Sequence, residues 1–248
     1  MSYMLFNCLI NIAVGIAYNI GLSGHASCEL TWISTDSEHA FRQNKIAHPN
    51  EMANWHEHSV TYRINEHGFR GDMLPGSAMF LGCSHTFCTG LPENAAWPWI
   101  VSAELGLPCT NLGVNGGSND TAFRLAHHWV PKLRPKILFW LQTYKERLEI
   151  LAYDDIHNYS TQNESPFGSP TDKDVFYQNW ISTDENFFLN FEKNLRGIQS
   201  ICDEVSVPLV RLDVDDDLQY LDKARDLSHH GVLSNRAFAA IVLSKINQ

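Results

Sequence analysis

The sequence predicts an α/β fold in three layers, in which helices cover both faces of a mostly parallel β-sheet. From residue 77 onward, segments with strand and helix character alternate, and this alternation implies parallel strands joined by right-handed crossovers. The segment 137–141 is apolar throughout, as expected for a strand that is buried on both faces. Hydrophobic residues make up 44% of the 248 residues and charged residues 19%, which is enough apolar material for a sizeable core.

The first half of this domain is expected to hold two strands and two helices. An apolar run over 77–82 predicts the first strand, and apolar residues at helical spacing predict a helix over 94–105. A second strand is expected over 108–114. The next helix is expected over 118–130, with Ser118 as its N-cap, because a serine hydroxyl can accept a hydrogen bond from the first helical turn.

The second half begins with the third strand and continues through a polar segment. Residues 152–184 are rich in Asn, Ser, Thr, Asp and Pro and predict a long loop, a kind of loop that is uncommon unless it is functional. A helix is expected over 186–205, a fourth strand over 207–212 and a closing helix over 231–246. We find no internal repeat.

Residues 1–75 are predicted to form an N-terminal leader and an irregular arm, followed by the main domain over 76–248. Residues 4–22 are largely apolar, but three asparagines interrupt them and no Lys or Arg precedes Arg42. The positive region of a secretory signal is therefore missing, and a membrane-spanning helix is not favoured either.

The composition argues against several classes of ligand. A formal net charge of −10 without a basic run is unsuited to nucleic-acid backbones. The six cysteines include no C-x-x-C pair, so we expect buried free thiols rather than a zinc site. The histidines at 56, 58, 127 and 128 lack the spacing of a helical ligand pair, so no metal is expected.

Polar residues follow the predicted strands at the point where each strand ends. Ser84 follows the first strand, a glycine-rich turn at 111–117 follows the second, and Asp226 and His229 lie beyond the fourth. The carboxyl ends of parallel strands form the ligand-binding edge of such folds. A serine hydroxyl needs a neighbouring base, histidine can be that base, and aspartate can orient it. Backbone N–H groups in a glycine-rich turn can bind an oxyanion. This set of residues therefore indicates nucleophilic hydrolysis.

These segments resemble the sequence blocks of the SGNH (or GDSL) hydrolase family. Gly82-Cys83-Ser84 resembles the first block, usually Gly-Asp-Ser, and the glycine-rich turn resembles the second. Asp226-Leu227-Ser228-His229 resembles the final D-x-x-H block. Residues 62–70 resemble a segment that often precedes the first block in bacterial and phage members, so the similarity covers about residues 62–245.

The resemblance implies a flavodoxin-like α/β/α domain and assigns roles to individual residues. Ser84 would be the nucleophile, His229 the base and Asp226 its orienting partner, while the backbone N–H of Gly116 would bind the oxyanion. It further implies cleavage of a carboxylic ester through an acyl-enzyme on Ser84. The substrate would be an O-acetyl group on a glycan or a small lipid-like ester. No metal or organic cofactor is implied.

The chain departs from the family pattern at two places. Cys83 replaces the usual aspartate of the first block, so the hydrogen bonds of that carboxylate are lost. The third block, Gly-x-Asn-Asp after the third strand, is absent, and with it the asparagine that donates to the oxyanion. Tyr144 aligns most simply with that asparagine, but Gln142 lies on the same strand face and carries an amide, so we favour Gln142 as the donor.

Several alternatives stay open at this stage. Ser84 could simply cap the next helix, and Cys83 could be the nucleophile, although its side chain should point elsewhere. His85 could line the pocket or be an ordinary loop residue, and His230 could be a solvated or substrate-side neighbour. We expect a structural ion pair between Arg147 and Glu149, and a core position for the aromatic cluster of Phe187, Phe188 and Phe191.

Two functional alternatives compete with an esterase. The missing third block favours a non-catalytic protein that keeps the fold for carbohydrate binding or for a structural role, for instance in a virion. An acyltransferase is the other, because it shares the acyl-enzyme with a hydrolase.

Overall fold

A four-stranded parallel sheet forms the centre of the protein, which we describe from a computed structural model over residues 27–151, 156–159 and 183–246. The strand order is β4-β3-β5-β8, with β3 (Ala78–Gly82) and β5 (Ile137–Gln142) inside and β4 (Cys109–Gly113) and β8 (Leu209–Asp213) at the edges. The predicted leader and most of the predicted loop over 152–184 lie outside the described residues.

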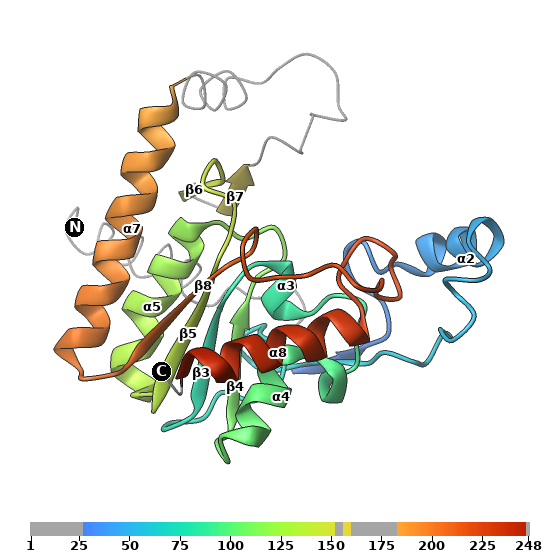
Figure 1. Cartoon of the computed structure of the whole chain (residues 1–248), viewed down its shortest axis with the longest axis horizontal. Coiled ribbons are helices and arrows are strands. Elements are labelled where there is room, and N and C mark those ends of the chain that lie inside the picture. Colours follow the sequence, from blue (N-terminus) through green and yellow to red (C-terminus); the bar gives the residue numbers. More distant parts are fainter. Residues whose placement is uncertain (1–26, 152–155, 160–182, 247–248) are drawn as a thin grey trace, which may run out of the picture.

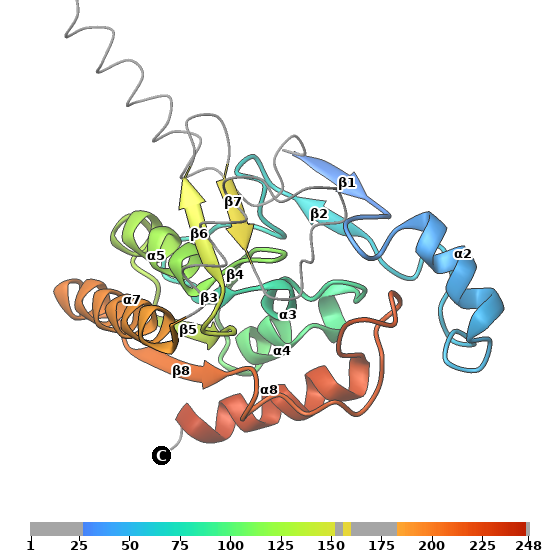
Figure 2. The same cartoon turned by 90° about the horizontal axis from the view of Figure 1, so that it is seen from above.

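Two helices cover each face of this sheet (Figures 1 and 2). On one face lie α4 (Trp97–Glu104) and α8 (Val232–Ile246), and on the other lie α5 (Asn119–Leu133) and α7 (Asp184–Glu204). Side chains of β3 alternate between the two cores, because neighbouring residues of a strand point to opposite faces. The predicted three-layer α/β/α fold is therefore confirmed.

The predicted strands and helices of this domain are confirmed to within a few residues. Ser118 caps α5 as expected, since its hydroxyl accepts from Thr121 N at 3.2 Å and the Thr121 hydroxyl accepts from Ser118 N at 3.1 Å. A 3₁₀ turn, η1 (Glu93–Ala95), precedes α4. The short helix α3 (Ser84–Phe87) and the antiparallel pair of β6 (Leu148–Leu151) and β7 (Ile156–Tyr159) were not predicted.

The described part of the arm contains three regular elements that the sequence did not predict. It contains the helix α2 (Glu38–Ala47), and β1 (Cys28–Leu30) pairs with β2 (Tyr62–Ile64) in antiparallel fashion. Val60, Tyr62, Ile64 and Phe69 are fully or almost fully buried, so the arm packs firmly on the rest of the molecule. The division at residue 76 stays a prediction.

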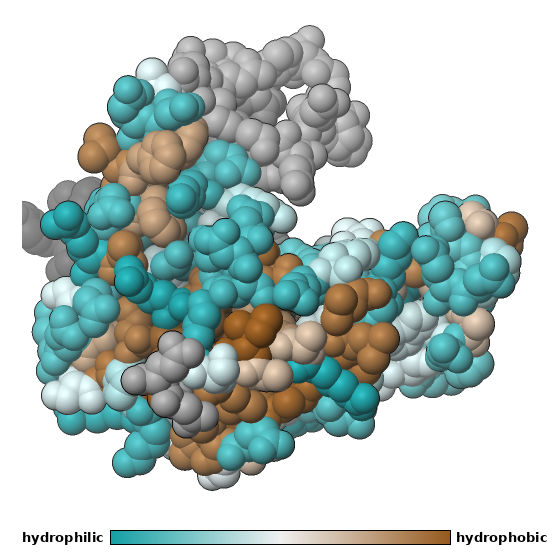
Figure 3. All heavy atoms as spheres, in the orientation of Figure 1, coloured by the Kyte–Doolittle hydropathy of each residue, from teal (hydrophilic) through white to brown (hydrophobic). Residues whose placement is uncertain are grey.

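Some side-chain predictions can also be compared with the structure. All five described cysteines are free thiols, as expected, but Cys28 and Cys109 are only half-buried. Phe191 packs against the α5–α7 core, but Phe188 is 49% exposed, so the expectation of a core position for it was wrong. No helix in the described part of the chain is long and apolar enough to cross a membrane. Apolar side chains reach the surface over the α4–α8 layer, whereas α2 carries mostly polar ones (Figure 3).

Candidate active site

Ser84 lies at the carboxyl end of β3, where it begins the short helix α3. Every residue of β3 is buried, and the chain leaves the sheet at Gly82. The carbonyl of Cys83 accepts hydrogen bonds from Thr86 N and Phe87 N, both at 3.0 Å, so this turn is fixed by its own backbone. The serine is half-buried, whereas Cys83, which precedes it, is completely buried. The sheet therefore presents Ser84, rather than Cys83, at its carboxyl edge, which is where open α/β folds usually bind ligands.

The predicted Asp226–His229 pair is formed in the structure. His229 Nδ1 lies 2.6 Å from Asp226 Oδ2, and the backbone N–H groups of Ser228 and His229 each donate to Asp226 Oδ1 at 3.1 Å. Thr35 Oγ1 also donates to Oδ2, at 2.7 Å. With Nδ1 held by the carboxylate, Nε2 of His229 is the nitrogen left for a substrate or a nucleophile.

The Asp226 carboxylate is kept ionised by these partners. Burial acts to raise the pKa of Asp226, but the hydrogen bond and charge of His229, with the hydrogen bond from Thr35, outweigh it and lower this pKa below its ordinary value. An ionised carboxylate can orient the imidazole of His229 and stabilise its protonated form.

Gly90 allows the segment after Ser84 to touch the segment before Asp226. Its φ angle is +79°, and its carbonyl accepts from Arg225 N at 3.1 Å. A Cβ atom at this position would lie 2.8 Å from Ala224 Cβ and 3.2 Å from Asp226 Oδ1, so only glycine fits without a shift. The segments that carry Ser84 and Asp226 are thereby in contact, although among the described residues no hydrogen bond joins Ser84 to His229.

Three histidine rings lie together beside Ser84. The ring centroid of His85 is 5.4 Å from that of His229 and 4.9 Å from that of His230. Burial, followed by the charges of His229, His230 and Arg147, lowers the pKa of His85 to about 3, and burial with the charge of His229 lowers that of His230 to about 4. His85 and His230 are therefore neutral near pH 7. His85 is half-buried and belongs to the helix α3 rather than to a loop, and its ring lies against the rings of His229 and His230.

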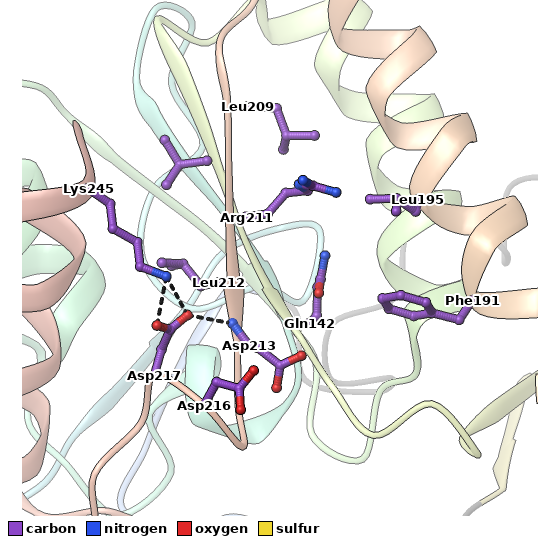
Figure 4. Close-up of a pocket in the computed structure, with 11 residues that line it drawn as sticks. Gln142, Phe191, Leu195, Leu209, Arg211, Leu212, Asp213, Asp216, Asp217 and Lys245 are labelled. Carbon is purple, nitrogen blue, oxygen red and sulfur yellow. Dashed lines mark hydrogen bonds and ion pairs between the residues drawn. The ribbon is translucent and has the colours of Figure 1, made fainter. Parts of the chain in front are cut away.

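The two predicted oxyanion donors lie in different surroundings. Gly116 occupies the exposed turn after β4 with a φ angle of +72°. Gln142 lines a hollow of ≈ 620 Å³ between β8 and α7, together with Phe191, Arg211 and Asp213 (Figure 4). None of Ser84, Asp226 and His229 lines this hollow. The position of Gln142 thus adds no support to its predicted role.

Asn115 is an amide in the glycine-rich turn that sequence reasoning did not single out. Thr89 Oγ1 donates to Asn115 Oδ1 at 2.8 Å, while Asn115 Nδ2 is buried without a hydrogen-bond partner. An unpaired buried donor costs roughly 1–3 kcal/mol and calls for an explanation. The one sequence signal that could have indicated Asn115 is that it directly precedes Gly116, the predicted oxyanion donor.

Arg147 does not pair with Glu149, so that expectation was wrong. Glu149 instead accepts from Arg124, with Nε 2.7 Å from Oε1. Arg147 Nη1 donates to the Gly117 carbonyl at 3.3 Å and to Thr143 Oγ1 at 3.1 Å, and its guanidinium covers the ring of Tyr144. Arg147 therefore joins the glycine-rich turn to the end of β5, where Tyr144 also lies. In the described ranges no three metal-ligating side chains converge.

Comparisons with known proteins give few further clues. No protein-family model matches the chain, and no curated protein sequence matches it either. Nine solved chains match, among them an acetyl xylan esterase, AlAXEase. That match has 15% sequence identity and a TM-score of 0.35, and it covers 68% of this chain and 98% of the esterase. A likeness this weak carries no functional argument, so function is inferred below from the geometry of the site.

Proposed function

We propose that this protein is a serine hydrolase that cleaves a carboxylic ester through an acyl-enzyme on Ser84. The observation that carries the proposal is the 2.6 Å contact between His229 Nδ1 and Asp226 Oδ2, which sets the tautomer and direction of an imidazole next to the serine-bearing segment. The close approach at Gly90 supports it, because this residue ties the serine segment to the aspartate segment.

The proposed reaction runs in two halves. His229 Nε2 takes the proton from Ser84 Oγ as that oxygen attacks the acyl carbon, and the imidazolium then returns the proton to the leaving alcohol. In the second half, His229 takes a proton from water as the water oxygen attacks the acyl carbon, and then returns that proton to Ser84 Oγ as the carboxylic acid leaves. Asp226 stays ionised and stabilises the imidazolium in both halves. An O-acetyl group on a glycan is the substrate class we favour.

Backbone donors of Ser84 and Gly116 would stabilise the oxyanion, and a side-chain amide would add a third hydrogen bond. Gln142 was the predicted amide. Asn115 is the stronger candidate, since its Nδ2 group is buried and unpaired whereas Gln142 lines another hollow.

Ser84→Ala is expected to lower kcat for p-nitrophenyl acetate by about 10³- to 10⁶-fold, because the nucleophile is lost. Cys83→Ser is the matched control, since it changes the neighbouring buried side chain but keeps the proposed nucleophile, and it should retain activity. Equal rates in wild type and Ser84→Ala would refute the esterase and favour a non-catalytic binding or structural protein. Mass spectrometry of products formed with added sugar acceptors separates hydrolysis from acyl transfer.

Asn115→Ala should lower kcat by about 10²-fold, the usual effect of removing one oxyanion donor, while Gln142→Ala should change it little. The measurement is the same ester assay on both variants, with melting temperatures to confirm that each is folded. The opposite ranking would reinstate Gln142 as the donor.

A further inference from the structure

Two hydrogen bonds join the N-terminal arm to Asp226, across 191 and 182 positions of the sequence. Thr35 Oγ1 donates to Asp226 Oδ2 at 2.7 Å, and Asn44 Nδ2 donates to the Asp226 carbonyl at 3.2 Å. Thr35 lies in the tight turn from Ile33 to Asp36, which is closed by a hydrogen bond from Ile33 N to the Asp36 carbonyl at 3.0 Å. The arm thus contacts both the backbone and the carboxylate of the proposed orienting residue.

A buried ion pair beside these contacts anchors the arm. Arg225, which directly precedes Asp226, is completely buried, and its Nη2 lies 2.7 Å from Oδ2 of the equally buried Asp36. Arg225 Nη1 also donates to the Glu57 carbonyl at 2.6 Å, and its guanidinium lies 4.1 Å from the ring centroid of Trp32. These contacts hold the Thr35 turn against the Asp226 segment.

The same network reaches the Ser84 segment. The Tyr62 hydroxyl donates to Asp36 Oδ2 and accepts from Gly90 N at 2.8 Å. Burial, followed by the charge of Asp36, holds the pKa of Tyr62 well above its ordinary value, so the hydroxyl keeps its proton. Arg70, another buried arm residue, donates to the carbonyls of Phe87 and Cys88 at 3.0 and 2.8 Å. The arm therefore makes hydrogen bonds to both the Ser84 segment and the Asp226 segment.

Thr35 completes the hydrogen bonding of the Asp226 carboxylate. A carboxylate offers about four acceptor positions. Here the N–H groups of Ser228 and His229 occupy Oδ1, and His229 Nδ1 and the Thr35 hydroxyl occupy Oδ2. Without the hydroxyl, one position on the oxygen that faces His229 would be open, and the carboxylate could rotate away from the imidazole or bind water there.

We propose that Thr35 is a positioning residue of the active site, which fixes the Asp226 carboxylate so that it orients His229. The inference rests on the proposed function of Ser84, Asp226 and His229. It adds that part of the catalytic arrangement is supplied by the arm. Thr35 touches no reacting atom in this scheme, so it acts through Asp226 alone.

Thr35 and its neighbours also set the charge on Asp226. The titratable groups that interact with the carboxylate are His229 on its own segment, His85 from α3 and Tyr220. The ion pair of Arg225 and Asp36 adjoins it, because Arg225 precedes Asp226 and Asp36 follows Thr35. His229 and Thr35 both lower the pKa of Asp226 by hydrogen bonding to its charged form. Loss of the Thr35 hydroxyl should therefore raise this pKa, and the carboxylate should be protonated at a higher pH than in the wild type.

The test compares Thr35→Val, which removes the hydroxyl at nearly constant size, with Thr35→Ser, which keeps it. In the full-length protein, ¹³C NMR of the Asp226 carboxyl should show a higher pKa in Thr35→Val and the wild-type value in Thr35→Ser. In the ester assay, Thr35→Val should lower kcat about 10-fold at unchanged KM, as expected for one hydrogen bond to a charged group. Thr61→Val, at an exposed threonine of the same arm, should change neither readout.

A Thr35→Val titration that coincides with the wild type would overturn the inference, whatever the activity. It would also fail if Thr35→Ser behaved like Thr35→Val, because the effect would then come from packing of the arm rather than from the hydroxyl. The carboxyl titration does not require turnover. If Ser84→Ala keeps the wild-type rate, the proposed function fails while the NMR comparison still decides the role of Thr35.

Discussion

Asp226→Asn is expected to lower kcat for p-nitrophenyl acetate by about 10⁴-fold, with the fold intact. Both oxygens of Asp226 accept hydrogen bonds, Oδ1 from two backbone N–H groups and Oδ2 from Thr35 and His229. An asparagine amide can accept at only one of its two ends. If its NH₂ group faced His229, Nδ1 would have to become the acceptor, which would place the proton on Nε2 and leave Ser84 without a base.

Steady-state kinetics of Asp226→Asn, with circular dichroism to confirm folding, checks this expectation. Asp216→Asn is the matched control, because Asp216 is an exposed carboxylate of the segment after β8 and lies outside the proposed catalytic set. A decrease of less than 10-fold in Asp226→Asn would mean that Asp226 does not orient the base.

Asp36→Ala should lower the free energy of unfolding by about 3–5 kcal/mol, the usual cost of removing one partner from a buried ion pair. The guanidinium of Arg225 would remain buried without its carboxylate, and the Tyr62 hydroxyl would lose its acceptor. Leaving one charge buried without its partner destabilises the fold by much more than the intact ion pair stabilises it.

Urea unfolding at neutral pH measures the effect. The control is Glu38→Ala, which breaks an exposed ion pair with Arg42 on the same arm and should cost about 0–1 kcal/mol. If Asp36→Ala stays within about 1 kcal/mol of the wild type, the Asp36–Arg225 pair does not anchor the arm.

The central fold could be predicted because its sequence pattern is local. The strand β5 is uniformly apolar, and α5 shows a serine cap followed by apolar residues at helical spacing, so each element can be recognised without its partners. The arm gave no such pattern. In α2, Phe41 is the one fully buried residue, so the helix depends on contacts that a window of neighbouring residues does not contain.

In the candidate site too, contacts between residues close in sequence could be predicted and contacts between distant residues could not. The Asp226–His229 contact joins residues three apart, and the sequence motif predicted it. The contact of Thr35 with Asp226 joins residues 191 apart, and a threonine in a polar segment gives no signal of its own. Asn115 was missed because its importance depends on the absence of a partner for Nδ2, which only the folded arrangement reveals. The roles of these residues in catalysis stay predictions until the variants above are measured.

The Arg225–Asp36 pair has a consequence for how the chain can be divided. A protein beginning at residue 76 would contain Ser84, Asp226 and His229, and so the three sequence blocks that resemble the SGNH family. It would lack the carboxylate that neutralises Arg225 and the hydroxyl that fills the fourth position on Asp226. The smallest active fragment would then have to include the arm as well as the sequence blocks. The reason is that the buried charge of Arg225, beside Asp226, needs the carboxylate of Asp36.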